Sequence, residues 1–580
     1  MGTISDKLMR IINTKEDIRQ ALISKGYDVP TSIPFKEYAK MISDLPCRVD
    51  SFPDIEGIVA RYSALGLTNE QMAENPVWKD LTDNGHDLQM KNLAWKGMSG
   101  VGGYVGDFSK WVNNRDTTEI GITKSNSKVI IDVKVSQGSG KNIVFISKSN
   151  LGISNNVTIK ITSTYPEGVM KFANSASNKY LKLPSNGIIT LQDNPECTSN
   201  EMHLHLASAD LGQITIEQLP LYPGALVFDG VDDYGVCDNF PILTKEKGYT
   251  VVALRQWDQD FLNTTLTGGL LSTRNYSTGE GVAFEKIESS NKSYWNLGAG
   301  GIIDFAKSPF TWQTSKQYNN VGILKGDKNH GKPLCVGCGL SGGQQSGRFA
   351  IWELVILDHD ATEEELTKIK DYFVKTYPWL FPDQAWTVVG KTNEDEDRAT
   401  IANITGNGND LVLSNFGFAE GSGYNEEGEY AGYLVTDGVD DKIISSIFKM
   451  GNDWTVIGDW ELINTGKNDN AGIVKFDSIV IYNYNYNSML INIKNGRNIL
   501  IPDQNTVNAI CSDGRIYSKD WKESIYNEET ESTSKNFLTI GYSGNAYTKI
   551  AFKNLAIYPT VLSREDCIKA YNYLQTLKAK

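Results

Sequence analysis

Two short segments carry the densest groups of carboxylates in the chain. LVFDGVDDY holds Asp229, Asp232 and Asp233, and LVTDGVDDK holds Asp437, Asp440 and Asp441. Clustered carboxylates on a loop suit Ca²⁺, so these six residues are the candidate metal ligands, and Ca²⁺ is the one cofactor that the sequence suggests. In the alternative interpretation, D-G-x-D-D is a tight strand-entry turn whose Asp side chains accept backbone N–H groups. We favour this second interpretation, and recurrence of the motif fits both.

Alternating Tyr and Asn residues form a second candidate surface. The run places Tyr482, Tyr484 and Tyr486 on one face of an expected strand and three Asn residues on the other. Exposed aromatic rings stack on sugars, so these three Tyr residues are the candidate glycan-binding residues. The same alternation also describes a half-buried strand with its Tyr side chains inward, and we prefer that interpretation.

The sequence lacks the patterns of common hydrolases. Retaining glycoside hydrolysis needs two carboxyl groups about 5–5.5 Å apart, and no E-x-D-x-x-E strand pattern occurs. Glu353 and Glu461 stand singly among apolar residues, in WELVIL and WELIN. Cys335 and Cys338 form one C-x-x-C, without the second pair that a structural zinc site would need. We therefore expect no catalytic residues and no enzyme.

Composition narrows the class of partner. The formal net charge is -14 without a dense Lys/Arg run, so we expect no nucleic-acid partner and no anionic membrane. No run of about 18 apolar residues is present, which argues against a membrane span. The N-terminal segment lacks the apolar core of a secretory signal, and seven scattered Cys residues make no disulfide framework. These features predict synthesis in a cytoplasm.

Three pairs of segments recur along the chain. Residues 81–95 (LTDNGHDLQMKNLAW) match 404–418 (ITGNGNDLVLSNFGF) at an offset of 323, 226–234 match 434–442 at 208, and 354–373 match 555–574 at 201. Between the first and second matches the offset falls by 115. The first copy therefore carries about 115 extra residues between Trp95 and Leu226, which a compact domain tolerates only at a surface loop.

The repeat divides the chain into domains. The first copy spans 52–104 and 220–382, and the second spans 384–580. The extra residues, 105–219, contain short alternating runs separated by Gly, Ser and Asn, which predict an immunoglobulin-like sandwich. We expect its strands within SKVIIDVKVS, NIVFIS, VTIKITS, GIITLQ, EMHLHLAS and QITIEQL.

Both copies are predicted to end in an apolar strand and one covering helix. The expected strands are Phe349 to Leu357 and Ile550 to Tyr558. Thr362 with Glu365, and Ser563 with Asp566, stand at capping-box spacing before the two expected helices. A sandwich whose last core strand is followed by a helix fits both copies.

The first 46 residues differ from the rest. Residues 3–12, 15–25 and 35–43 read as three short helices with apolar stripes, which together can hardly bury a core alone. Two interpretations are equally supported: the unit packs on the first sandwich, or it docks into a partner or self-associates.

The joint order of these motifs resembles a known group. The DGVDDY and DGVDDK strands, the LTDNGHDL segment and the strand-plus-helix endings are similar to concanavalin A-like (laminin-G-type) jelly-roll domains. IINTKEDIRQALISKGYDVP, ARYSALGLTNE, YPGALVFDGVDDYG and LTKEKGYTVVALRQW resemble virion structural proteins of crAss-like bacteriophages. The resemblance covers most of the chain and least of all residues 105–219.

That resemblance implies a mainly β fold with two jelly-roll sandwiches, an inserted immunoglobulin-like β-domain and a small N-terminal helical unit. It implies a structural fibre or appendage on the head or tail of a virion, made in the host bacterial cytoplasm. The expected partners are other capsid or tail proteins, through residues 1–46, and further copies of the chain. Host or mucosal glycan is a further expected ligand. A free lectin-like protein and a polysaccharide depolymerase are the alternatives.

Overall fold

The structure is a computed structural model. It describes Lys15, Arg19 and residues 52–113, 120–135, 145–147, 157–166, 170–174, 180–191, 202–206, 211–243, 248–262, 264, 266–273, 283–287, 292–295, 301–304, 321–324, 333–340, 343–427, 430–446, 448–449, 451–463, 472–476, 479–484, 488–493, 497–501, 507–518, 521–525, 535–536, 538–543 and 546–579. Two compact units are distinguished, one of Met1–Asp54 with Lys368–Tyr377 and one of Ile55–Thr367 with Pro378–Lys580.

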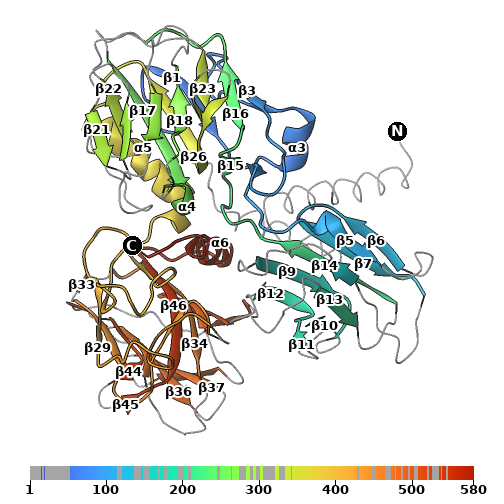
Figure 1. The fold of residues 1–580 in the computed structure, drawn as a ribbon, viewed down its shortest axis with the longest axis vertical. Helices are drawn as coiled ribbons and strands as arrows, with labels where there is room; N and C mark the ends of the chain where they lie inside the picture. Colours follow the sequence, from blue (N-terminus) through green and yellow to red (C-terminus); the bar gives the residue numbers. More distant parts are fainter. Residues whose placement is uncertain are drawn as a thin grey trace, which may run out of the picture. The chain divides into compact units, whose positions relative to one another are not determined.

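The first sandwich contains two mainly antiparallel sheets of described strands, with one parallel pairing, between β18 and β25 (Figure 1). One sheet has the order β22 (Val321–Leu324), β17 (Tyr249–Trp257), β26 (Arg348–Leu357), β15 (Leu226–Asp229) and β4 (Gly100–Val101), with β1 (Ile58–Ser63) also on β26. The other has the order β2 (Val77–Trp78), β3 (Leu88–Lys91), β16 (Tyr234–Cys237), β23 (Leu334–Val336), β18 (Gly268–Ser272), β19 (Ala283–Ile287), β20 (Lys292–Trp295) and β21 (Gly301–Asp304), with β24 (Cys338–Leu340) and β25 (Gln344–Ser346) beside β18. Tyr62 and Ile351 of the first sheet share one apolar core with Leu88 and Leu271 of the second.

The second sandwich repeats this plan. Its first sheet has the order β30 (Gly423–Asn425), β31 (Tyr433–Val435), β46 (Ile550–Tyr558), β34 (Thr455–Leu462), β39 (Val507–Cys511), β40 (Arg515–Ser518) and β41 (Glu523–Ile525), with β27 (Gln384–Thr387) on β46. Its second has the order β28 (Thr400–Ile401), β29 (Leu411–Ser414), β32 (Lys442–Ser445), β43 (Leu538–Ile540), β35 (Gly472–Phe476), β36 (Ile479–Tyr484), β37 (Ser488–Ile493) and β38 (Arg497–Ile501). Two small pairs join β33 (Phe448–Lys449) to β42 (Lys535–Asn536) and β44 (Tyr542–Ser543) to β45 (Ala546–Tyr547).

The insert, residues 105–219, forms two sheets of its own. One has the order β11 (Tyr180–Lys182), β10 (Met170–Asn174), β13 (Met202–Leu206), β8 (Phe145–Ser147) and β5 (Trp111–Asn113). The other has the order β12 (Asn186–Leu191), β9 (Val157–Ser163), β14 (Gly212–Gln218), β7 (Lys128–Val133) and β6 (Ile120–Lys124). All six expected strand segments contain a strand. Alternating side chains such as Ile159 and Ile161 of β9 make a core that Met170 of β10 joins.

The insert occupies the place of a β-hairpin turn. Val101 of β4 pairs with Leu226 of β15, and the same pairing joins Tyr424 to Leu434 in the second sandwich. Beyond that pair, the Leu221 N–H donates to the Gly103 carbonyl (2.9 Å), which holds the two connecting segments together. The inserted residues thus leave and re-enter the first sandwich at adjacent positions.

The helices that follow the last core strands are capped as expected. Helix α5 (Glu363–Thr376) begins after Thr362, whose N–H donates to Glu365 Oε2 (2.8 Å), while the Glu365 N–H donates to Thr362 Oγ1 (3.3 Å). Helix α6 (Arg564–Leu574) is capped by Ser563, which accepts the Asp566 N–H (3.1 Å). These bonds satisfy amide groups that a helix start leaves unpaired.

The remaining described helices are short: α3 (Asn69–Glu74), α4 (Gln259–Leu262), η1 (Phe108–Lys110) and η3 (Pro378–Leu380). None of the helices in the described part of the chain has the length and apolarity to cross a bilayer. Lys15 and Arg19 are helical, and the other residues of the three expected N-terminal helices lie outside the described residues.

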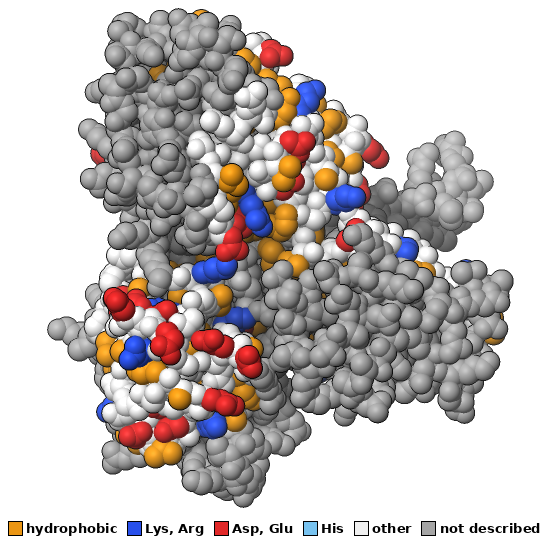
Figure 2. Space-filling view, viewed as in Figure 1, with side chains coloured by type: hydrophobic (Ala, Val, Ile, Leu, Met, Phe, Trp, Pro, Cys, Tyr) orange, Lys and Arg blue, Asp and Glu red, His pale blue; other side chains and the backbone are white. Residues whose placement is uncertain are grey.

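The expected mainly β fold class is confirmed. The domain boundaries drawn from the repeat stay predictions. On the described face in Figure 2, acidic side chains gather over the second sandwich, with single Lys and Arg side chains among them.

Candidate functional site

The recurring LTDNGHDL segment is a hydrogen-bonded loop. In the first sandwich, Asp80 Oδ1 accepts the Thr82 N–H (3.0 Å) and hydroxyl (2.8 Å), and also the Arg61 N–H (3.1 Å). Asp87 Oδ1 accepts the N–H of Asp80 itself (3.0 Å). Each polar side chain therefore satisfies backbone groups of the loop or of the neighbouring strand β1.

The same bonds recur in the second sandwich. Asn403 stands at the position of Asp80, and its Oδ1 accepts the Thr405 N–H (3.0 Å) and hydroxyl (2.9 Å). Asp410 accepts the Asn403 N–H (2.8 Å), as Asp87 does for Asp80. The bonds to Oδ1 are kept, but Asp80 Oδ2 accepts the His86 N–H (3.0 Å) where Asn403 Nδ2 donates to the Gly408 carbonyl (2.5 Å). The shared part of the network therefore needs one acceptor oxygen at this position and not a charge.

The first D-G-x-D-D segment is a turn closed by its own carboxylates. Asp233 is buried, and its Oδ2 accepts the Asp229 N–H (3.0 Å) while its Oδ1 accepts the Ser99 hydroxyl (2.9 Å). Asp229 Oδ1 accepts the Val231 N–H (2.7 Å). Gly230 has φ +78°, and a Cβ there would lie 2.7 Å from Cβ of Arg348, so only glycine fits.

The second segment has the same geometry. Asp441 is buried and its Oδ2 accepts the Asp437 N–H (2.8 Å), while Asp437 Oδ1 accepts the N–H groups of Val439 (2.7 Å) and Asp440 (3.2 Å). These bonds agree with the turn interpretation of both motifs. Asp232 and Asp440, the middle carboxylates, are exposed.

The cation interpretation concerns the same atoms. In each of the two sets, one carboxylate oxygen per Asp lies within 4.8 Å of the others, close enough to share an ion. The structure thus brings each predicted set together, at Asp229, Asp232 and Asp233 and at Asp437, Asp440 and Asp441. Binding of Ca²⁺ stays a prediction, and Asp229 and Asp233 in the first set and Asp437 and Asp441 in the second also accept backbone N–H groups.

Burial gives the two inner carboxyl groups a pH dependence. Desolvation raises the pKa of Asp233, and that of Asp441, from about 3.8 to about 6. A raised folded-state pKa stabilises the fold below the unfolded-state pKa, and this contribution is lost as pH rises through about 6. The wild type should lose this contribution as the pH rises from 4 to 7, whereas a double Asp233→Asn and Asp441→Asn variant, which has no carboxyl group to titrate at these positions, should not. We therefore expect the free energy of unfolding of the variant, relative to that of wild type, to increase over this range. Urea unfolding across that range measures the difference, and parallel curves would contradict the shift.

The structure reaches only part of the predicted glycan surface. Strand β36 ends at Tyr484 and β37 begins at Ser488, so Tyr482 and Tyr484 share a strand that lies between β35 and β37. Tyr486 lies outside the described residues, as do the side chains of Tyr482 and Tyr484. A sugar-stacking role for the three Tyr residues stays a prediction.

The two glutamates considered for hydrolysis have different surroundings. Glu353 on β26 is fully buried, and its Oε2 forms an ion pair with Nη2 of Arg61 (3.3 Å). Glu461 on β34 is half-buried. A buried carboxylate held by an arginine is typical of a structural ion pair.

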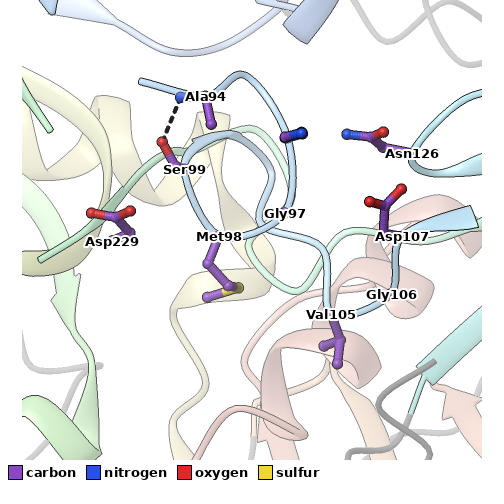
Figure 3. Close-up of a pocket in the computed structure, with 10 residues that line it drawn as sticks. Ala94, Gly97, Met98, Ser99, Val105, Gly106, Asp107, Asn126 and Asp229 are labelled. Carbon is purple, nitrogen blue, oxygen red and sulfur yellow. Dashed lines mark hydrogen bonds between the residues drawn. The ribbon is translucent and has the colours of Figure 1, made fainter. Parts of the chain in front are cut away.

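A pocket lies where the insert joins the first sandwich (Figure 3). Its volume is about 270 Å³, and its lining combines a loop of the first sandwich, the turn of Asp229 and the first residues of the insert. The lining residues are Ala94, Lys96, Gly97, Met98, Ser99, Val105, Gly106, Asp107, Asn126 and Asp229. Of these, only Asp229 was a candidate from the sequence.

One sequence signal points to the pocket in retrospect. The loops AWKGMSG (94–100) and GFAEGSG (417–423) are equivalent, and both close by a two-residue bridge, Lys96 with Ser99 and Ala419 with Ser422. Lys96 and Met98 differ between two loops of the same backbone pairing. Residues that differ between two copies with the same backbone are candidates for a function that only one copy has.

Comparisons with known proteins give structural neighbours without a family. No protein-family model matches the chain, and no curated protein matches it. Among solved structures, the chain is similar to the Trypanosoma rangeli sialidase in complex with sialic acid, at 8% identity and a TM-score of 0.25, covering 78% of this chain and 83% of that one. It is also similar to the binding domain of botulinum neurotoxin serotype D, at 12% identity and a TM-score of 0.22, covering 60% and 89%. At these scores the neighbours carry no argument about function.

Proposed function

We propose that this chain is a non-enzymatic structural protein of a bacteriophage virion, a head or tail fibre or appendage that also adheres to host or mucosal glycan. The observation that carries the proposal is the structural role of the polar residues that recur in both sandwiches. Asp80, Asp87 and Asp233 and their counterparts accept backbone or hydroxyl protons within turns. Motifs that both copies retain for such turn-forming bonds indicate a duplicated structural scaffold.

The sequence resemblance supplies the biological setting. Residues 1–46 act as the anchoring and assembly unit in this proposal, binding other virion proteins or further copies of the chain. The two sandwiches and the insert form the body that faces outward. The net charge of -14 over the whole chain suits a soluble, outward-facing role without nucleic acid.

Mass in solution tests the assembly part. We expect the full chain to be a dimer or a larger oligomer, and a variant lacking residues 1–46 to be a monomer with both sandwiches folded. Light scattering gives the masses, and circular dichroism reports folding. A truncated chain that stays oligomeric and still joins particles would refute the anchoring role, and a monomeric full chain would favour a free lectin-like protein.

A further inference from the structure

We propose that the pocket between the first sandwich and the insert binds a single neutral sugar ring. The inference rests on the proposed adhesive function and names its site and ligand class. Its volume of about 270 Å³ lies just below the usual range of about 300–1,000 Å³ for small-molecule sites. A pocket of this size accommodates one sugar ring.

The polar groups face the pocket from opposite sides. In Figure 3, Asp229 lies on one side, and Asp107 and Asn126 lie on the other. Asp107 and Asp229 each use Oδ1 to accept a backbone N–H of their own turn, at 3.1 Å from Ser109 and 2.7 Å from Val231. A carboxylate has further lone pairs, and an amide both donates and accepts. Sugar hydroxyls need such acceptors and donors around the ring.

Two apolar side chains also line the pocket. Figure 3 shows the Met98 side chain extending from its loop between the two polar sides, and Val105 adds a second apolar side chain at the lower edge. A flexible thioether adapts to irregular shapes. A sugar ring carries C–H groups between its hydroxyls, and these are the atoms that Met98 and Val105 would contact.

Charge selects among sugars. Asp107 and Asp229 contribute two negative charges to the lining and Lys96 contributes one positive charge. The whole chain is also acidic. A carboxylated sugar would be repelled by this balance, so we expect neutral hexoses and N-acetylhexosamines to bind in preference to sialic acid.

The second sandwich provides an internal comparison. Ala419 and Gly421 stand at the positions of Lys96 and Met98, while Ser422 and Asp437 match Ser99 and Asp229. A short hairpin between β30 and β31 replaces the insert, so no counterpart of Asp107 or Asn126 exists there. The scaffold residues recur, and the residues special to the pocket do not.

Calorimetric titration of the full chain with methyl glucoside, methyl galactoside, N-acetylglucosamine and N-acetylneuraminic acid tests the inference. We expect at least one neutral sugar to bind, and N-acetylneuraminic acid to bind more weakly. Lys96→Ala introduces the residue that the second sandwich has there, so it should fold, and Asn126→Ala removes only the side-chain amide. Each variant should raise the Kd for the neutral sugar at least about tenfold, because each removes one hydrogen bond between the sugar and a charged or polar group.

Lys91→Ala is the matched control, since Lys91 is also an exposed lysine, and it lies on β3 outside the lining. It should leave the Kd unchanged. Failure of every neutral sugar to bind, preference for N-acetylneuraminic acid, or a Kd unaffected by both pocket variants would overturn the inference. Those results would leave the oligomeric mass unchanged, so they are distinguishable from a failure of the assembly proposal.

Discussion

Replacing Arg61 by Ala is expected to destabilise the first sandwich by about 3–5 kcal/mol, the usual cost of removing one partner of a buried ion pair. Glu353 is fully buried on the central strand β26, and Nη2 of Arg61 is 3.3 Å from its Oε2. Without the guanidinium, the carboxylate loses that counter-charge in a place that water does not reach. Urea unfolding of the variant measures the loss.

The second sandwich supplies the matched control. Ala385 is the counterpart of Arg61 in the second sandwich. Arg61 pairs with Val355 and Ala385 pairs with Ala556, and Val355 and Ala556 are separated by the repeat offset of 201. Asn554 likewise stands in place of Glu353. We expect the double variant Arg61→Ala and Glu353→Asn, which copies the second sandwich, to recover part of the loss because no buried charge remains. A single variant as stable as wild type would show that the pair contributes nothing.

Replacing Asp233 by Ala is expected to cost about 2–4 kcal/mol, because it leaves the Asp229 N–H and the Ser99 hydroxyl without their acceptor in a buried turn. Replacing the exposed neighbour Asp232 should change stability by less than about 0.5 kcal/mol. Asp441→Ala and Asp440→Ala give the same contrast in the second sandwich, as measured by urea unfolding.

This contrast also separates the two interpretations of the motif. Unfolding is repeated with added Ca²⁺ and with a chelator. If the carboxylates only close a turn, Ca²⁺ leaves the transitions in place and Asp232→Ala stays neutral. A rise in stability with Ca²⁺ that Asp232→Ala removes would show a bound cation, because binding to the folded state alone stabilises it.

Local pattern and repetition predicted much of the fold. The runs around Ile131, Ile159 and Ile216 alternate cleanly, and each is a strand with alternate side chains buried. Strands β5, β6, β10 and β11 were not expected. Two of them, β5 and β11, have only three residues, and β6 contains a glycine, so these three sequences hold too little alternation to mark a strand.

The pocket illustrates what a single sequence does not specify. Its lining joins residues near 96, 107, 126 and 229, which meet only because two domains share a junction. Neither Lys96 nor Asn126 belongs to a motif. The D-G-x-D-D turns were predictable because the backbone N–H groups that their carboxylates accept lie within four residues of them in sequence.

The place of the insert has a consequence for the order of folding. The pair Tyr424 with Leu434 closes a loop of ten residues, whereas the equivalent pair Val101 with Leu226 is separated by 125. Closing the longer loop as a flexible chain costs about 2 kcal/mol more. An insert that folds first brings its own two ends together and removes most of that difference. During synthesis, the β4–β15 pairing of the first sandwich should therefore form after the insert has folded. The β30–β31 hairpin of the second sandwich can form as soon as it leaves the ribosome.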